Sequence, residues 1–345
     1  MSGPPTLEQV AALAGVSRAT VSRVVNGSPK VSPVVRAQVE RAVAKLGYVP
    51  NRAARSLVTR RADSVALVVS EPHARFFSEP FFAGMVRGVS AVLTETGVQL
   101  LLLIAQDVPG SPDPPGRGRL ERYVVGGHVD GVLLASLHGD DPLPGTLERA
   151  GVPAVLVGRP AGGVGATPAS YVDADNRGGA RAAVEHLIRR GRRRIATITG
   201  SLDMGVGLDR LAGYRDGLAT AGLAGAGELV EPGDFTEEGG AAAMARLLAR
   251  PGDPVDAVFA ASDLMAAGAL RALRAAGRRV PEDVAVVGFE DSAVARYAQP
   301  PLTTVRQPIE EMGRQATRLL LAQIAGEAGG MHLILDTDLV VRSST

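Results

Sequence analysis

The side chains best suited to binding a small polar molecule follow short apolar runs of the kind that form buried β-strands. Ser70, Arg159 and Glu290 each lie within two residues of the end of such a run. Ligands of open parallel sheets bind beyond the carboxyl ends of the strands, so these side chains are expected to surround one site. Their hydroxyl, guanidinium and carboxyl groups suit a polar ligand bound by hydrogen bonds.

Several neighbouring candidates have both a binding and a structural interpretation. Arg210 is the strongest candidate for ligand contact, because a planar guanidinium recognises hydroxyls or a carboxylate with two hydrogen bonds. Ser262 is equally consistent with a helix N-cap and with a ligand contact. Asp291 is interpreted as structural, hydrogen-bonded to backbone amides of its loop. Phe81 and Phe82 are either core residues or, for at least one of them in a chain without Trp, a stacking platform.

The sequence contains no pattern typical of an enzyme or a metal site. It has no cysteine, which excludes disulfides and thiolate chemistry. It has no GxxxxGK phosphate loop, no GxSxG elbow and no nucleophile paired with a base. The histidines are scattered without metal-ligand spacing: His73, His128, His138, His186 and His332. We therefore expect no catalysis, no metal and no cofactor.

Positive charge is concentrated in the first 61 residues. They hold ten Lys or Arg against Glu8 and Glu40, a net charge of +8, so residues 62–345 must carry −7 to give the chain total of +1. A small basic module joined to an acidic body is typical of proteins that bind a polyanion such as nucleic acid.

The basic module has the pattern of three short helices. Thr6 and Gln9 have the spacing of a capping box before an apolar helix face. Gly15 allows a tight turn, and Ser17 can cap a second helix at 18–25. Ser32 followed by Pro33 starts the third helix, which Gly47 ends. Residues 52–59 form a basic segment that is too short to be a stable helix alone in water. From its residues alone it is interpreted as a flexible solvated linker.

From Ser64 onward the chain alternates between strand and helix patterns, which predicts parallel sheets covered by helices on both faces. The number of strands indicates two sheets, and the region 333–341 is also strand-like. The expected strands are 64–69, 98–105, 130–135, 153–157, 194–199, 228–231, 255–260 and 284–288. The expected helices are 81–96, 119–125, 142–150, 177–190, 208–221, 237–250 and 263–276.

The run TLEQVAALAGVSRATVSRVVNG and the following GYVPNRAARSLVTRR resemble, almost residue for residue, the DNA-binding headpiece of the lactose-repressor/galactose-repressor (LacI/GalR) family of transcriptional regulators. The resemblance implies a recognition helix in the major groove and a hinge helix whose leucine wedges into the minor groove. The residues expected at DNA are Thr6, Ser17, Arg18, Ala19, Thr20, Ser22, Arg23, Asn26, Asn51, Ala54 and Leu57.

Later motifs resemble the body of the same family, which is a two-lobed fold like that of periplasmic binding proteins. These motifs are VGR (157–159), VDADNRGGARAAVEHL (172–187), RLAGY (210–214), ASD (261–263), VVGFEDS (286–292) and PPLTTVRQP (300–308). The resemblance implies three chain crossings between the lobes, near 172–175, 302–306 and 335–338. The implied effector contacts are Ser70, Phe81, Phe82, Arg159, Asp173, Arg210, Ser262, Asp263 and Glu290. Glu290 departs from the aspartate usual in the family, which leaves the ligand's identity open.

The expected organisation is therefore α/β with three parts. A helix-turn-helix headpiece covers 1–50, a hinge helix 51–61 and an effector-binding and dimerisation body 62–345. In the body, lobe 1 takes about 62–172 and 307–336, and lobe 2 takes about 173–306 and 337–345.

The resemblance implies a repressor that binds a palindromic operator in double-stranded DNA as a homodimer. A small polar effector, a sugar or sugar derivative, would switch it from the cleft between the lobes. The alternative is a regulator of the same architecture that responds to a nucleobase or another metabolite. The chain has no apolar run long enough to cross a membrane and no secretion signal, so we expect a cytoplasmic protein. An exported solute receptor would have no use for the basic headpiece.

Overall fold

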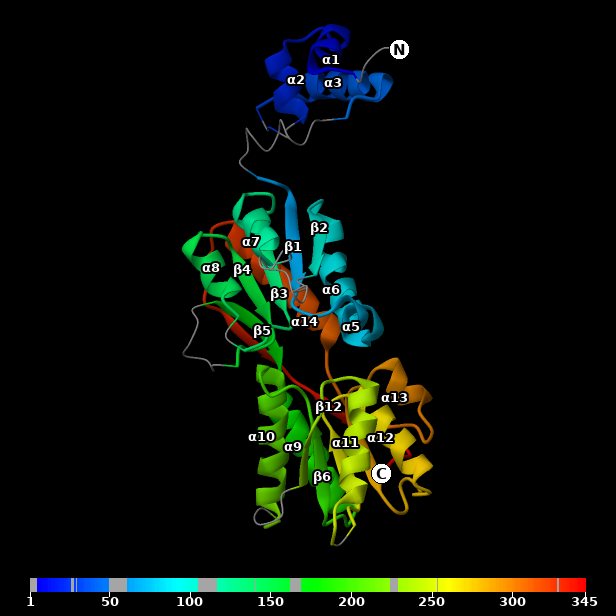
Figure 1. Cartoon of the computed structure of the whole chain (residues 1–345). Helices are drawn as coiled ribbons and strands as arrows, with labels where there is room; N and C mark the ends of the chain where they lie inside the picture. Colours follow the sequence, from blue (N-terminus) through cyan, green and yellow to red (C-terminus); the bar gives the residue numbers. More distant parts are fainter. Residues whose placement is uncertain are drawn as a thin grey trace. The chain divides into compact units, whose positions relative to one another are not determined.

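The computed structural model describes residues 5–25, 28, 30–49, 61–104, 117–139, 141–161, 169–223, 229–252, 254–327 and 329–345. Two compact units, residues 1–63 and residues 64–345, make up the chain (Figure 1). The predicted hinge, 51–61, lies outside the described residues except for Arg61.

The first unit is a bundle of three helices, α1 (Leu7–Ala14), α2 (Arg18–Val25) and α3 (Pro33–Leu46). The predicted capping box is present, since the backbone N–H of Gln9 donates to Thr6 Oγ1 at 3.3 Å and that of Thr6 donates to Gln9 Oε1 at 2.9 Å. Gly15 ends α1 with a φ of 66°, in the left-handed region that favours glycine. The predicted start and end of each helix are therefore confirmed to within a residue.

A small aliphatic core holds these helices together. Val10, Val21 and Val39, one from each helix, have no exposed surface. Burying one such side chain contributes about 1.5–3 kcal/mol, so these contacts supply much of the stability of a bundle this small. The opposite side of α2 is left exposed.

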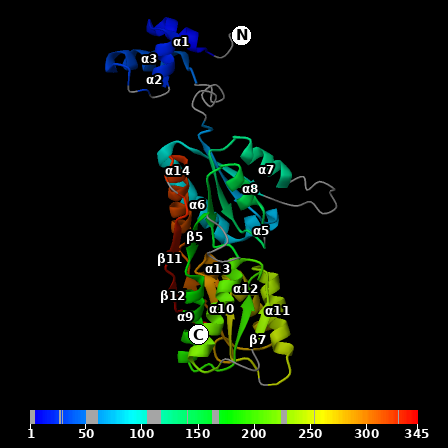
Figure 2. The same ribbon diagram turned by 90° about the vertical axis from the view of Figure 1, so that its left-hand side faces the viewer.

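The second unit contains two six-stranded sheets. The first has the order β11-β5-β4-β3-β1-β2, with every neighbouring pair parallel. Its strands are β1 (Ser64–Val69), β2 (Gln99–Ile104), β3 (Gly131–Ala135), β4 (Ala154–Val157), β5 (Ser170–Ala174) and β11 (His332–Leu335). Helices cover both faces: α6 (Pro80–Thr96) and α14 (Ile309–Ile324) on one, α7 (Arg117–Val125) and α8 (Leu143–Arg149) on the other (Figure 2).

The second sheet has the order β12-β10-β9-β8-β6-β7, and only β12 runs antiparallel to its neighbour. Its strands are β6 (Ile195–Thr199), β7 (Leu229–Pro232), β8 (Ala257–Ala260), β9 (Ala285–Glu290), β10 (Thr303–Arg306) and β12 (Asp338–Val340). The helices on one face are α9 (Asn176–Arg189) and α10 (Gly205–Thr220), and on the other α11 (Glu237–Ala249) and α12 (Asp263–Ala275). The predicted fold class, with helices on both faces of mostly parallel sheets, is confirmed.

The chain passes between the sheets three times, after β5, after β10 and after β11. Two passages lie where the sequence places them. The prediction of 302–306 for the second is wrong, because residues 303–306 pair within the second sheet and the passage follows at Gln307 and Pro308. The prediction of one strand-like region over 333–341 also needs correction, because this region divides into β11 and β12, which belong to different sheets.

A cavity between the lobes and a basic headpiece as candidate functional sites

A cavity of about 690 Å³, part of it open to solvent, lies between the two sheets of the body. Its walls come from segments that follow the carboxyl ends of strands in both sheets, as the rule for parallel sheets predicts. The polar and aromatic residues that line it are Arg75, Glu79, Phe81, Ser136, Arg159, Asp173, Arg210, Phe235, Glu290 and Gln307.

Arg210, on α10, is almost fully buried in the wall of the cavity. Its Nε donates to Asn176 Oδ1 at 2.9 Å, Nη1 to the carbonyl of Ala261 at 2.5 Å, and Nη2 to Gln307 Oε1 at 3.2 Å. The guanidinium carbon lies 3.7 Å from the ring centroid of Phe289. Burial lowers the pKa of Arg210 to about 10, so the group stays charged at neutral pH. These contacts use three of the five N–H donors and fix the plane of the guanidinium in the wall of the cavity.

Three buried carboxyl groups share this cavity. Burial, together with the charges of Glu79 and Asp263, raises the pKa of Glu290 well above its ordinary value. Burial also raises the pKa of Glu79 and raises that of Asp173 to about 6. Among the described residues Asp173 Oδ2 accepts no hydrogen bond, and its ion partner, Arg159 Nε, is 3.8 Å away. The cavity therefore offers acceptors that also become donors when protonated.

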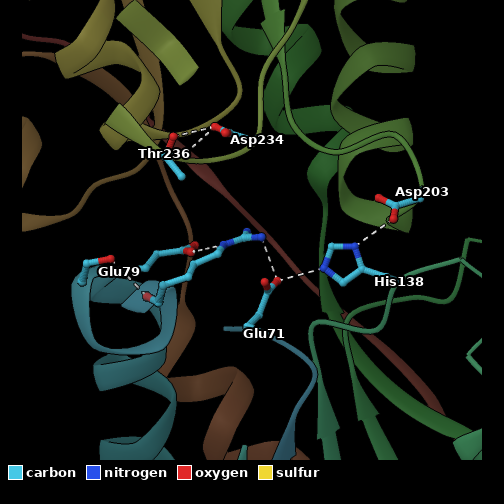
Figure 3. Close-up of polar contacts among 8 residues, drawn as sticks. Glu71, Glu79, His138, Asp203, Asp234 and Thr236 are labelled. Atoms are coloured by element: carbon cyan, nitrogen blue, oxygen red, sulfur yellow. Dashed lines mark hydrogen bonds and ion pairs between the residues drawn. The ribbon is translucent and has the colours of Figure 1, made fainter. Parts of the chain in front are cut away.

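A polar network continues at the rim of the cavity (Figure 3). Arg75 contacts Glu71 Oε1 through Nη1 at 2.8 Å and Glu79 Oε2 through Nε at 3.0 Å. His138 Nε2 lies 3.0 Å from the same oxygen of Glu71. The guanidinium carbon of Arg75 is also 5.1 Å from the ring centroid of Phe235, in the opposite lobe. These contacts place a neutralised cation beside an aromatic face.

Two ionic contacts join the lobes on the side of the N-terminus of α10. His138 Nδ1 lies 2.9 Å from Asp203 Oδ2, and the N–H of Gly139 donates to the carbonyl of Asp203 at 2.8 Å. Arg159 forms an ion pair with Asp209. Hydrogen bonds from His138, above all to Glu71, raise the pKa of its imidazole. Protonation of the imidazole thus favours the contact between His138 and Asp203.

Backbone strain is concentrated at the cavity. Ser136, Phe235 and Glu290 all line it, and all have positive φ (56°, 67° and 117°), which costs energy for residues other than glycine. The segment carrying Phe235 is held by Asp234 Oδ1, which accepts from the N–H of Thr236 at 3.0 Å and from its hydroxyl at 2.7 Å (Figure 3). Such strain is typical of sites where side-chain position is set by function.

Five predicted effector residues line the cavity, namely Phe81, Arg159, Asp173, Arg210 and Glu290. Four do not. Ser70 donates to Asp141 Oδ2 at 3.4 Å, and Phe82 is buried in the apolar core below α6. Ser262 accepts a hydrogen bond from the N–H of Met265 at 3.2 Å and so caps α12, which is the structural one of its two predicted roles.

Asp263 and Asp291 are both engaged inside the second lobe. Asp263 accepts from the hydroxyl of Thr304 at 2.6 Å and the N–H of Ser292 at 2.7 Å. Asp291 has a structural role, but its partners are the side chains of Arg306 and Arg342 rather than the backbone amides expected.

The sequence interpretation did not include Arg75, Glu79, Phe235 or Gln307 as cavity residues. Phe235 and Gln307 each lie within three residues of a strand end, so the strand-end rule would have selected them once β7 and β10 were correctly bounded. Arg75 and Glu79 lie on and after the short helix α5 (His73–Ser78), which the sequence pattern did not predict.

Seven of the predicted DNA-binding residues lie in the described part of the headpiece. Ser17, Arg18, Ala19 and Arg23 are exposed at the start and along the outer side of α2, with Thr6 exposed at the start of α1. Thr20 and Ser22 are half-buried, and the N–H of Thr20 donates to Ser17 Oγ at 3.1 Å. The predicted DNA contacts outside the described residues are Asn26, Asn51, Ala54 and Leu57.

No helix among the described residues is both long and apolar enough to cross a membrane. Within the same residues, no group of three or more His, Cys, Asp or Glu side chains is arranged to hold a metal ion.

The chain is similar to known proteins in family, sequence and structure. Residues 6–51 match the model of bacterial regulatory proteins of the lacI family, and residues 184–345 match that of a periplasmic binding protein-like domain. The HTH-type transcriptional regulator CelR of Thermobifida fusca is 58% identical over 99% of this chain and 98% of its own. The regulator GalR of Escherichia coli (strain K12) is 38% identical over 92% and 88%.

Two solved structures extend over almost the whole chain. A complex of the transcriptional regulator CelR with cellobiose has a TM-score of 0.77 and 54% identity, and covers 99% of this chain and 100% of that one. The lac repressor dimer bound to operator and the anti-inducer ONPF has a TM-score of 0.84 and 28% identity, covering 99% of each chain.

Proposed function

Since this chain belongs to the lacI family of bacterial regulatory proteins and is a transcriptional regulator of that family, we propose that it is a repressor controlled by a neutral sugar. It binds a palindromic operator as a homodimer, because two headpieces reading a palindrome require two-fold symmetry. The effector is a short β-linked glucose oligosaccharide of the cellobiose class, bound in the cavity between the lobes.

The pairing of the cavity's cations supports a neutral ligand. Arg75 forms ion pairs with Glu71 and Glu79, and Arg159 forms one with Asp209. Arg210 donates to neutral oxygens of Asn176, Ala261 and Gln307, and the charges of nearby carboxyl groups, Glu290 foremost, act on its pKa. A sugar phosphate or another anion would therefore meet an excess of acidic groups in the cavity. Sugar hydroxyls, by contrast, donate to carboxylates and accept from guanidinium N–H groups at the same time.

The aromatic residues favour a pyranose over a smaller polar metabolite. Phe81 from the first lobe and Phe235 from the second both line the cavity. Apolar C–H faces of glucose units pack on aromatic rings, while equatorial hydroxyls reach the polar groups around them. The relative whose solved complex contains cellobiose is 54% identical over nearly the whole chain, which supports the same class of ligand.

A melting-temperature screen of the full chain tests the effector class. A ligand that binds the folded state stabilises it by about 2.7 kcal/mol at a concentration 100 times its Kd. We expect cellobiose and cellotriose to raise Tm, with glucose 6-phosphate, adenine and guanine inactive. A rise with a nucleobase alone would support the alternative class of regulator and contradict the proposed sugar.

The repressor activity and assembly need a separate test. Electrophoretic mobility shift with duplexes selected from a randomised pool is expected to yield palindromic sites. Sedimentation of the complex is expected to count two chains per duplex. A single chain on DNA, or selected sites without symmetry, would contradict the proposed dimeric repressor.

A further inference from the structure

The ion pair between Glu8 and Arg18 connects the first two helices of the headpiece. Arg18 Nε lies 3.0 Å from Glu8 Oε1, with side chains 70% and 62% exposed. Glu8 is in the first turn of α1, and Arg18 is the first residue of α2. The contact therefore holds the side chain at the leading end of α2, on the outer surface of the headpiece.

The carboxylate of Glu8 is unexpected on the surface of a strongly basic headpiece. Glu8 and Glu40 are the two acidic residues among the first 61, against ten basic ones. A negative charge close to DNA repels phosphates and weakens binding to any sequence. An ion pair as exposed as this one contributes little to the stability of the headpiece. Neither general affinity nor stability thus accounts for the acid beside Arg18.

The atoms used in the contact suggest what the acid does. Glu8 meets Nε, so the two terminal nitrogens of Arg18 are not needed for the ion pair. Those two nitrogens form the fork that donates to O6 and N7 of guanine in the major groove. A long arginine side chain has many rotamers, and an ion pair at Nε reduces the number that remain. The carboxylate itself is anchored, since hydrogen bonds from its own backbone N–H and from Thr6 lower the pKa of Glu8.

We propose that Glu8 is a positioning residue that holds the Arg18 guanidinium end-on toward a guanine, and so increases base discrimination at the expense of general affinity for DNA. This inference rests on the proposed operator binding by the headpiece, with Arg18 reading a base. Glu8 acts through Arg18 and has no base of its own to read.

The test compares three variants of the full chain with Glu40→Gln as the matched control. Glu8→Gln and Glu40→Gln each remove one negative charge from the headpiece, but only the first replaces the ion pair with Arg18 by, at most, a neutral hydrogen bond. Glu8→Asp keeps the charge in the first turn of α1 and shortens the side chain. Arg18→Ala removes the base-reading group. The probes are a duplex selected by the wild-type chain from a randomised pool, its single-base substitutions, and a random-sequence duplex.

Both glutamine variants are expected to bind the random duplex more tightly, because each has one carboxylate fewer near phosphate. Only Glu8→Gln is expected to reduce the preference for guanine at the Arg18 position, by about threefold to tenfold. Glu8→Asp should reduce that preference without tightening binding to the random duplex. In an Arg18→Ala background, Glu8→Gln should have no further effect on the preference.

Two results would overturn the proposal, and they are distinguishable. If Arg18→Ala relaxes the preference and Glu8→Gln leaves it unchanged, Arg18 reads the base without help from Glu8. If Arg18→Ala weakens binding to all duplexes equally, Arg18 meets only phosphate. The proposed base reading by Arg18 then fails, and the role of Glu8 fails with it. Unfolding followed by circular dichroism separates either result from loss of the headpiece fold.

Discussion

His138 Nδ1 lies 2.9 Å from Asp203 Oδ2, and this contact joins the two lobes of the body at the rim of the cavity. The other ring nitrogen, Nε2, lies 3.0 Å from Glu71 Oε1. A neutral imidazole has one donor and cannot donate to two carboxylates, whereas an imidazolium has two. The arrangement of the lobes in this structure therefore favours the protonated ring.

Effector affinity is expected to increase as pH falls toward the ordinary pKa of an imidazole, about 6.5. Contacts with Glu71 and Asp203 raise the pKa of His138, so closing the lobes takes up a proton when the open form has an ordinary imidazole. The gain in effector affinity that His138 provides is complete below the ordinary pKa of an imidazole, about 6.5. This gain is lost as pH rises through the raised pKa of His138. Titration calorimetry with cellobiose, in buffers of different ionisation enthalpy, measures both affinity and proton uptake.

Two variants isolate the role of His138 in this pH dependence. His138→Asn removes the titrating ring and should flatten the profile above pH 6.5. Asp209→Asn removes the ion pair with Arg159 without changing the His138 ring, and should weaken binding while keeping the slope. Asp173 has a raised pKa of about 6 and contributes mainly at lower pH. An unchanged slope in His138→Asn would assign the pH dependence to another group.

Asp173 is expected to reduce the stability of the free protein. Burial raises its pKa to about 6, so its ionisation destabilises the fold, and this cost appears as pH rises from the ordinary pKa of the carboxyl through 6. Asp173→Asn should raise the free energy of unfolding at pH 8 by about 1–3 kcal/mol, because Asn keeps an oxygen for the N–H of Ala174. The same change should weaken cellobiose binding by removing a charged acceptor. Denaturant unfolding at pH 5 and pH 8 tests this prediction. The difference in free energy of unfolding between Asp173→Asn and wild type should be smaller at pH 5 than at pH 8.

Local signals in the sequence were sufficient to place most elements. Thr6, Ser32 and Gly47 act through their own neighbours in the chain, so the predicted helix ends were correct. The strand-end rule likewise identified the correct edge of each sheet for Arg159 and Glu290, because all strands of a parallel sheet end on the same side.

The rule could not give the direction of a side chain. Ser262 and Asp263 follow β8 at the correct edge, yet they form hydrogen bonds to Met265 and Thr304 within their own lobe. Whether a residue at a strand end faces a ligand depends on groups that arrive from distant segments of the sequence. The split of 333–341 into two strands has a similar cause, since pairing with β5 or β10 is non-local.

Gly88 is expected to be essential for the packing of α6 against α14. A Cβ added at this position would lie 2.1 Å from the carbonyl oxygen of Glu310, a backbone atom that cannot rotate away. Gly88→Ala should therefore destabilise the body by about 1–3 kcal/mol. At Gly118 on α7 the nearest atom to an added Cβ is the end of the Arg122 side chain, 3.8 Å away. The control Gly118→Ala should be neutral or stabilising by up to about 1 kcal/mol, and equal effects on Tm would contradict the assigned close contact.

Replacing Arg210 should separate the response to effector from the binding of DNA. Arg210→Ala removes a buried fork that holds Asn176 and Gln307 and faces the cavity, so it is expected to abolish cellobiose binding. It also leaves buried polar partners unsatisfied, at a cost of about 1–3 kcal/mol in stability. Arg210→Lys keeps the charge without the planar fork and should lose the response as well. The exposed Arg278, on the same lobe, provides the control variant Arg278→Ala, which should behave as wild type.

The phenotype of a folded Arg210→Ala protein gives the sign of the switch. Permanent operator binding in the mobility shift assay would mean that cellobiose is an inducer. Permanent loss of operator binding would mean that cellobiose is a corepressor, since a ligand shifts DNA binding only through its different affinities for two states. Reciprocity then requires that operator DNA change the affinity of the wild-type chain for cellobiose by the same factor. A full response to cellobiose in Arg210→Ala, with the fold intact by circular dichroism, would place the effector outside this cavity.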